Sequence, residues 1–390
     1  MNYLFPQRLQ KIGPSQIREN MRLALESGAI NLAQGRPDFP TATLVKEAAI
    51  QAIAQDQNQY SVTWGLQELR EAIASHLLFR HGLTYDPETE ITITCGVTEA
   101  IVAAMLAVVE TGDEVIILEP AHENYVPAVY FAGGIPRFVT LRPPDFNFPY
   151  KELQNTITSR TRAIILNTPH NPSGHVFTKE ELNKILSLAE QHGIWVVTDE
   201  IYDHLFYAPH HHIAPASLAP GWKGMIMTGG LSKIYAATGW RLGYVIAAPN
   251  ISSAIRMVHD YLTICAPTPF QHAGVAALRL PGAYYTELRS TFLHRRDLIM
   301  TMLMESGFEP YAPQGAYYLL AGFEAWDHEG DSQSFTKRLI EDAKVAVVPG
   351  SAFYYQATDL GKHLVRFAFA KRSEVLMIAG ERLSNAFRNR

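Results

Sequence analysis

Residues 163–199 of the chain read AIILNTPHNPSGHVFTKEELNKILSLAEQHGIWVVTD. The apolar runs at 163–166 and 194–197 are short and lack the in-out alternation of a strand with one solvated face. Between them, Thr178-Lys179-Glu180-Glu181 has the pattern of a capping box, and Gly193 stands where a helix C-terminal cap belongs. The stretch therefore predicts a strand–helix–strand crossover, with parallel strands covered by helices on both faces.

Apolar segments of the same kind recur on both sides of this crossover. Residues 97–110 are rich in alanine and have the length of a helix. Strands are predicted at residues 91–94, 115–118, 163–167, 194–199, 225–228 and 242–247. This alternation predicts an α/β fold, in which a mostly parallel sheet is covered by helices on both faces.

The two ends of the chain show a different pattern of predicted helices and strands. A long helix near 284–306 is followed by short strands and helices, which indicate a smaller α+β domain. Four prolines interrupt the first 40 residues, which show little periodicity and suit an arm. The expected division is an N-terminal arm and part of the small domain (1–44), a large domain (45–285) and a small C-terminal domain (286–390).

The composition limits the classes of binding partner and the cellular location that can be expected. The 390 residues carry 33 Lys and Arg against 38 Asp and Glu, so no basic excess favours nucleic acid or an anionic membrane. The longest apolar run, residues 100–109, is too short to span a bilayer, and the N-terminus lacks a hydrophobic signal core. Two cysteines are too few for a disulfide framework. We therefore expect small-molecule partners and a cytoplasmic location.

Polar residues follow three of the predicted strands. Asn167 and Asn171 follow one strand, Asp199 ends the next, and Ser232 and Lys233 follow a third. Because ligands bind at the carboxyl ends of parallel strands, we expect these groups to share one crevice. The amine of Lys233 can form a Schiff base with an aldehyde cofactor, although a surface lysine would show the same local pattern. Asp199 either meets a polar partner or caps a helix.

Two further segments favour phosphate binding. Gly96-Val97-Thr98 opens a helix directly after a strand, so its backbone N–H groups are placed to bind an anion. Arg241 follows a glycine-containing turn, and its guanidinium can hold a phosphate by two parallel hydrogen bonds. Simple helix capping and a surface ion pair are the competing explanations.

The order of these motifs resembles that of one family. It runs from residues 167–174 (NTPHNPSG) through Asp199-Glu200-Ile201-Tyr202 to Lys233, Gly239 and Arg241. This order and spacing resemble the pyridoxal-phosphate-dependent class I and II aminotransferases of fold type I, over nearly the whole chain. The resemblance implies the cofactor pyridoxal 5'-phosphate and a ping-pong transfer of an amino group between an L-amino acid and a 2-oxo acid. It also implies a homodimer.

The resemblance implies a role for each matching residue. Lys233, Asp199 and Tyr202 are expected to be catalytic, with Lys233 as the Schiff-base lysine and proton shuttle and Asp199 beside the cofactor's ring nitrogen. Tyr60 is expected to reach the phosphate bound by the neighbouring subunit. The other matching residues are expected to bind the cofactor ring (Asn167, Asn171, Tyr202), its phosphate (Gly96, Val97, Thr98, Ser232, Arg241) and the substrate carboxylate (Gly35, Asn171, Arg366).

Two positions depart from the family pattern around the cofactor. His122 stands where the family usually places an aromatic ring that stacks on the cofactor, and Tyr125 is the alternative. Gly230 stands where many relatives have a phosphate-binding serine, which leaves Ser232 or Thr228 as the substitute.

Arg36 is the third departure, since the family often has an acidic, aromatic or polar residue after the glycine. One interpretation is that Arg36 binds a carboxylate on the substrate side chain, which would favour dicarboxylic substrates. The other is an ion pair with Asp38 or Glu123.

Other patterns are assigned ordinary roles. No metal site is predicted, since His210-His211-His212 has no acid or cysteine at ligand spacing. Tyr317 and Tyr318 could line a substrate pocket, but core packing is the preferred interpretation. A carbon–sulfur β-lyase with the same cofactor remains an alternative. A more distant one is a non-catalytic cofactor-binding regulator, which should carry a basic DNA-binding segment that is not evident.

Overall fold

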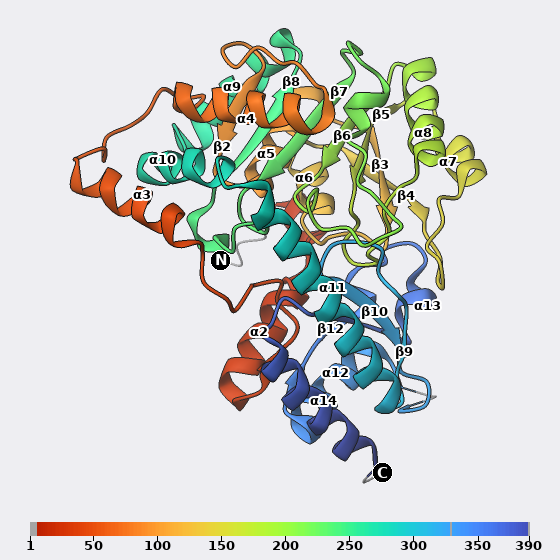
Figure 1. Ribbon diagram of the computed structural model, residues 1–390. Coiled ribbons are helices and arrows are strands. Elements are labelled where there is room, and N and C mark those ends of the chain that lie inside the picture. The colour runs from red at the N-terminus through yellow and green to blue at the C-terminus, as the bar shows by residue number, and fades with distance from the viewer. Residues whose placement is uncertain (1–5, 328–329, 389–390) are drawn as a thin grey trace, which may run out of the picture.

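The computed structural model describes residues 6–327 and 330–388, and its central feature is a sheet formed by residues 91–247 (Figure 1). Neighbouring strands from β7 to β4 are parallel, and β8 is antiparallel to both of its neighbours. In spatial order the strands are β2 (Ile91–Thr94), β8 (Gly243–Ala247), β7 (Met225–Gly230), β6 (Trp195–Asp199), β5 (Thr161–Asn167), β3 (Glu114–Glu119) and β4 (Ile135–Thr140). The mostly parallel sheet predicted from the sequence is confirmed.

Helices cover both faces of this sheet. Every residue of β2 and of β3 is buried, and alternate residues of a strand point to opposite faces. Helix α5 packs against β6, β7 and β8, and α8 packs against β6. The helices of this part of the chain are α3 (Thr43–Ala54), α4 (Gln67–His81), α5 (Val97–Val108), α6 (Tyr125–Phe131), α7 (Tyr150–Thr156), α8 (Lys179–His192), α9 (Pro249–Thr263) and α10 (Thr268–Leu278). Among the described residues, no helix has both the length and the apolar character needed to cross a membrane.

Strand β4 was missed by the sequence analysis because it lies at the edge of the sheet. Within the part of the chain that the structure describes, it pairs with β3 alone, and its first four residues are exposed or half-buried, so it lacks a continuous apolar run. Pro136 has no N–H for a second neighbouring strand, which an edge position tolerates.

A second sheet lies in the lower part of Figure 1. Its described strands follow the order β12-β13-β10-β9, with antiparallel neighbours. The strands and helices here are α11 (Gly282–Glu305), β9 (Glu309–Pro310), β10 (Tyr318–Gly322), α12 (Ser332–Ala343), β11 (Val345–Ala346), β12 (Val348–Pro349), α13 (Thr358–Gly361), β13 (Leu364–Ala368) and α14 (Ser373–Arg388). This mixture agrees with the α+β texture predicted after residue 282.

The N-terminal segment is more regular than an arm. It contains α1 (Gln7–Gln10), α2 (Gln16–Ser27) and β1 (Ile30–Asn31). Ser15 caps the start of α2 and Gly28 its end, and β1 pairs with β11. The segment predicted to be an arm rather than part of a sheet thus contains a helix and a short paired strand, and its prolines lie outside the helix that Ser15 and Gly28 delimit.

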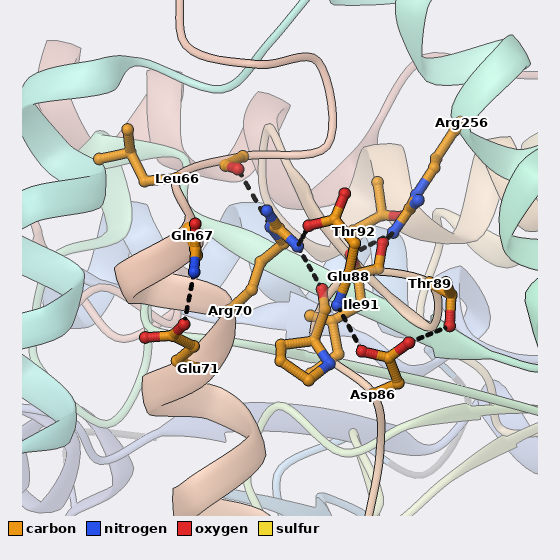
Figure 2. A network of polar contacts seen from close by, with 12 residues as sticks. Leu66, Gln67, Arg70, Glu71, Asp86, Glu88, Thr89, Ile91, Thr92 and Arg256 are labelled. Carbon is orange, nitrogen blue, oxygen red and sulfur yellow. Dashed lines mark hydrogen bonds and ion pairs between the residues drawn. The ribbon is translucent and has the colours of Figure 1, made fainter.

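Helix α4 is fixed to the loop that follows it by a network of polar contacts (Figure 2). Arg70 is 3% exposed, and it donates hydrogen bonds to the Gly65 and Pro87 carbonyl oxygens and pairs with Glu88 at 2.8 Å. Arg256 of α9 donates to the Thr92 hydroxyl at 3.0 Å. The Arg70 bonds thus fix α4 to the loop that precedes β2, and the Arg256 bond fixes α9 to β2 itself.

The predicted capping box of α8 is confirmed. The Thr178 hydroxyl accepts a hydrogen bond from the Glu181 backbone at 3.2 Å, and the Glu181 carboxylate accepts one from the Thr178 backbone at 2.8 Å. Gly193 forms the C-terminal cap. The helix of the crossover is thus bounded where the sequence indicates.

We expect Thr178→Ala to lower the free energy of unfolding by about 1 kcal/mol, because one N–H of the first turn of α8 loses its acceptor. Urea denaturation of the holoenzyme measures this change. Lys179→Ala, which alters an exposed residue that takes no part in the two hydrogen bonds of the box, is the control and should leave the free energy nearly unchanged. Equal stability of the Thr178 variant and the wild type would contradict the prediction.

Candidate active site

A cleft with a volume of about 1270 Å³ opens at the carboxyl ends of β5, β6 and β7. It is lined from the first sheet, the second sheet and the N-terminal segment. Most of the residues singled out in the sequence line it, namely Gly35, Arg36, Val97, Thr98, His122, Asn171, Asp199, Tyr202, Ser232, Lys233, Arg241 and Arg366. The shared crevice expected from the strand order is therefore present.

Three of the singled-out residues do not line this cleft. Asn167 is buried beneath it, where its amide nitrogen donates to the Asp199 carbonyl at 2.8 Å and its oxygen accepts from the Asn171 backbone at 2.7 Å. Gly96 directly precedes Val97, which lines the cleft. Tyr60 is 76% exposed on the surface of its own chain. Asn167 therefore positions the loop that carries Asn171.

Lys233 is a cleft residue and not an exposed surface lysine. It follows β7, is half-buried, and its Nζ donates a hydrogen bond to the Gly35 carbonyl at 3.1 Å. The Tyr317 hydroxyl donates to the same carbonyl at 3.1 Å. The amine is thus held between the end of β7 and the N-terminal segment.

Asp199 ends β6 as a buried carboxylate, 4% exposed. It accepts hydrogen bonds from the Tyr125 hydroxyl at 2.7 Å and from the Ile201 backbone at 3.2 Å. Burial raises the pKa of Asp199 to about 6, although the Tyr125 bond and the charge of Lys233 act in the opposite direction. The residues after Asp199 form turns, so Asp199 does not cap a helix.

The roles of His122 and Tyr125 are separated by their contacts. The Tyr125 hydroxyl is engaged by Asp199, and its ring lies perpendicular to that of His122 at 5.6 Å. His122 lines the cleft, and its Nδ1 has no partner among the described residues. Burial and the charges of Arg366 and Lys233 lower the pKa of His122, so its ring is neutral and suited to stacking.

The first turn of α5 forms an anion cradle beside Arg241. Gly96 is the N-cap, no side chain caps the helix, and Val97 and Thr98 line the cleft, so their N–H groups remain for a ligand. Gly96 has a φ of +80°, and a Cβ there would lie 2.5 Å from Arg241 Nη2. Only glycine lets this guanidinium approach the helix start.

Ser232 and Thr228 differ as substitutes for the serine that Gly230 lacks. The Thr228 hydroxyl donates to the Thr198 carbonyl within the sheet at 2.7 Å. Ser232 lines the cleft and Thr228 does not, which makes Ser232 the better candidate of the two.

Arg366 brings a buried guanidinium from β13 to the cleft, where it is 1% exposed. It donates to Asn171 Oδ1 at 2.9 Å and to the Ala33 carbonyl at 2.7 Å, while its Nε has no partner among the described residues. A buried donor of this kind suits a carboxylate ligand.

Tyr318 is a cleft residue that the sequence analysis assigned to the core. Its hydroxyl accepts a hydrogen bond from Tyr202 at 3.2 Å, and a Cβ at Gly35 would lie 1.7 Å from it. Burial raises the pKa of Tyr318, but the charges of Lys233 and Arg366 outweigh burial and lower it. Tyr317 also reaches Gly35 but does not line the cleft, and sequence alone did not reveal which of the two adjacent tyrosines would line it.

Arg36 lines the cleft without the ion pair that was considered for it. Asp38 instead accepts a hydrogen bond from the Arg372 backbone at 2.8 Å, and Glu123 accepts one from Ser15 at 2.5 Å. Among the described residues, no carboxylate lies within ion-pair distance of the Arg36 guanidinium.

The residues of the cleft fit pyridoxal phosphate. Lys233 supplies an amine for its aldehyde, Asp199 a buried carboxylate for its ring nitrogen, and the start of α5 with Arg241 a cradle for its phosphate. The cavity volume exceeds that of a typical ligand pocket and leaves room for a small substrate.

Comparisons with known proteins agree with this cleft. The family model "Aminotransferase class I and II" matches residues 27–381. The chain is 36% identical over 383 residues to the methionine aminotransferase of Escherichia coli (98% of each chain), and 35% identical over 387 residues to an aspartate aminotransferase of Pyrococcus abyssi (98% of each). The N-succinyldiaminopimelate aminotransferase structure from Mycobacterium tuberculosis superposes with a TM-score of 0.95 at 36% identity, over 98% of this chain and 100% of that one. The chain belongs to the class I and II aminotransferases, and it is a pyridoxal-phosphate-dependent aminotransferase of fold type I.

Proposed function

We propose that Lys233, Asp199, Tyr202 and Arg366 carry out the transfer of an amino group between an L-amino acid and a 2-oxo acid. The observation that carries this proposal is the position of the Lys233 amine, which lies in one cleft with the buried Asp199 carboxylate and the Arg366 guanidinium. An amine, an acid and a carboxylate clamp in one cleft are what the reaction requires.

Each group has a separate task in this proposal. Bound pyridoxal phosphate supplies an aldehyde and an electron-accepting ring. Arg366 binds the substrate carboxylate and so orients the hydrogen on the α-carbon. Lys233 holds the cofactor, and once released its Nζ moves the proton at the substrate α-carbon. Asp199, oriented by Tyr125, keeps a negative charge at the end of β6, and Tyr202 with Asn171 presents hydrogen-bonding groups to the cofactor ring.

The proposal includes a homodimer with shared sites, in which Tyr60 reaches the phosphate of the neighbouring cleft. Its support is an exposed apolar surface on and beside α3 and α9, of a kind typical of interfaces. The residues of this surface are Leu44, Ile50, Ile53, Tyr60, Val62, Met257, Tyr261, Leu262 and Ile264.

The proposed division places a large cofactor domain at 45–285 and forms the small domain from 1–44 and 286–390. The pairing of β1 with β11 and the location of the central sheet within 91–247 support it. Residues 1–5, 328–329 and 389–390 of these ranges lie outside the described residues.

The proposal also includes a reducing, cytoplasmic location, which the two free cysteines support.

We expect the purified protein to show a visible absorbance band that borohydride abolishes, with the reduced cofactor attached to the peptide containing Lys233. Lys233→Ala should lose this attachment and its transaminase activity, because it lacks the amine. Peptide mass spectrometry and assays with 2-oxoglutarate and pyruvate as acceptors measure both. Attachment elsewhere would overturn the role of Lys233, and pyruvate and ammonia release without an acceptor would favour the β-lyase.

We expect Tyr125→Phe to make cofactor binding more sensitive to acid. The Tyr125 hydrogen bond lowers the pKa of Asp199, so its loss raises that pKa from about 6, and protonated Asp199 lacks the charge that attracts the ring nitrogen. Binding to the cofactor-free protein should therefore weaken as pH falls, with a midpoint about one pH unit higher in the variant. Absorbance titrations at several pH values measure it, and Tyr150→Phe on α7 is the control. A midpoint unchanged by Tyr125→Phe would sink the positioning role.

We expect Arg36→Ala to lower kcat/KM for glutamate about tenfold to a hundredfold, as the loss of a charge-assisted hydrogen bond predicts, while methionine turnover changes little. This result would assign Arg36 to the side-chain carboxylate of dicarboxylic substrates. Parallel assays with both donors measure it, and Arg36→Lys should retain part of the preference. Equal losses for the two donors would refute the assignment.

A further inference from the structure

A cluster of histidines lies between α4 and the turn that follows β6. His76 of α4 and His204 of the turn face each other through their Nε2 atoms at 3.1 Å, and Asp203 Oδ2 lies 3.9 Å from His204 Nε2. One ligand atom from each of these residues lies within 4.8 Å of the others. None of the three is among the described residues that line the cleft.

The spacing of these atoms matches that of ligands around one metal ion. Zinc–nitrogen bonds are about 2.0–2.1 Å long, so two imidazole nitrogens on a tetrahedral zinc ion lie about 3.3 Å apart. The observed separation of His76 and His204 is close to this value. Asp203 Oδ2 lies 3.9 Å from His204 Nε2, and the three ligand atoms lie within 4.8 Å of one another, so the carboxylate must move inward to reach the tetrahedral spacing.

The contacts around these three residues also suit a metal. Arg80 pairs with Asp203 Oδ2 at 2.5 Å, which orients the carboxylate as an outer-shell hydrogen bond orients a metal ligand. His204 Nδ1 is buried without a partner among the described residues, so Nε2 is where this ring makes its polar contact.

We propose that His76, Asp203 and His204 bind a divalent transition-metal ion, with zinc as the ion that two imidazoles and a carboxylate suit. Water completes the coordination. The ion links α4 to the turn directly after Tyr202, whose side chain lines the cleft. It therefore stabilises the side of the cleft that Tyr202 forms. Sequence spacing does not reveal this site, because α4 and the turn meet only in the fold. The site does not rest on the proposed function.

The test measures zinc binding by the holoenzyme directly. Protein stripped with EDTA is dialysed against micromolar zinc chloride, and its metal content is determined. We expect one zinc ion per chain in the wild type and at least tenfold weaker binding in His76→Gln. His76 is half-exposed, and an unchanged cofactor absorbance and circular dichroism spectrum show that the variant folds. His192→Gln, on the exposed end of α8, is the matched control and should bind as the wild type does.

Two results would overturn the site: a wild type that takes up no zinc, or equal affinity in His76→Gln. Diffraction from zinc-soaked holoenzyme crystals at the zinc absorption edge gives an independent answer that needs no variant. An anomalous peak between His76 Nε2 and His204 Nε2 supports the proposal. Peaks found only elsewhere refute it, and leave the two histidines with their mutual hydrogen bond alone.

Discussion

The burial of the Asp199 carboxylate is the constraint on which the cleft depends. A charge in so buried a position is costly unless hydrogen bonds and an opposite charge offset its desolvation. Tyr125, the Ile201 backbone and Lys233 meet this need, and they follow β3, β6 and β7. Because these strands lie within the consecutive run β7-β6-β5-β3, the sheet order itself brings the three groups to one carboxylate.

Arg366 of the second sheet is likewise a buried charge that needs partners from other segments of the chain. Its guanidinium is almost fully buried and is satisfied by Asn171, which follows β5, and by the Ala33 carbonyl of the N-terminal segment. A buried cation that loses such partners is strongly destabilising. The strand β13, the loop after β5 and the N-terminal segment must therefore be in place together, which makes that segment a wall of the cleft.

Some features of this fold leave a pattern in the sequence, and others depend on contacts that form only in the folded chain. Strands such as β3 and β5 were predicted because burial on both faces produces continuous apolar runs, whereas the half-exposed edge strand β4 produces none. Most cleft residues were found because strand ends and motif order fix their place in the chain. Tyr318 was missed, since nothing in the pair Tyr317-Tyr318 indicates which of the two side chains lines the cleft. The contact of Tyr125 with Asp199 was also not foreseen, because it depends on side-chain direction between distant segments.

Gly230 shows how packing and binding are coupled at the proposed phosphate site. A Cβ at this position would lie 3.0 Å from Val97 Cγ2 and 3.2 Å from the Leu242 carbonyl, so a serine fits only if the Val97 side chain and the Leu242 backbone move by a few tenths of an ångström. The absence of a side chain lets the first turn of α5 lie directly against the end of β7. The uncapped first turn of α5 and Ser232 line the same cleft. The close packing at 230 leaves little room for a side chain, and the N–H groups of α5 supply donors in place of a serine there.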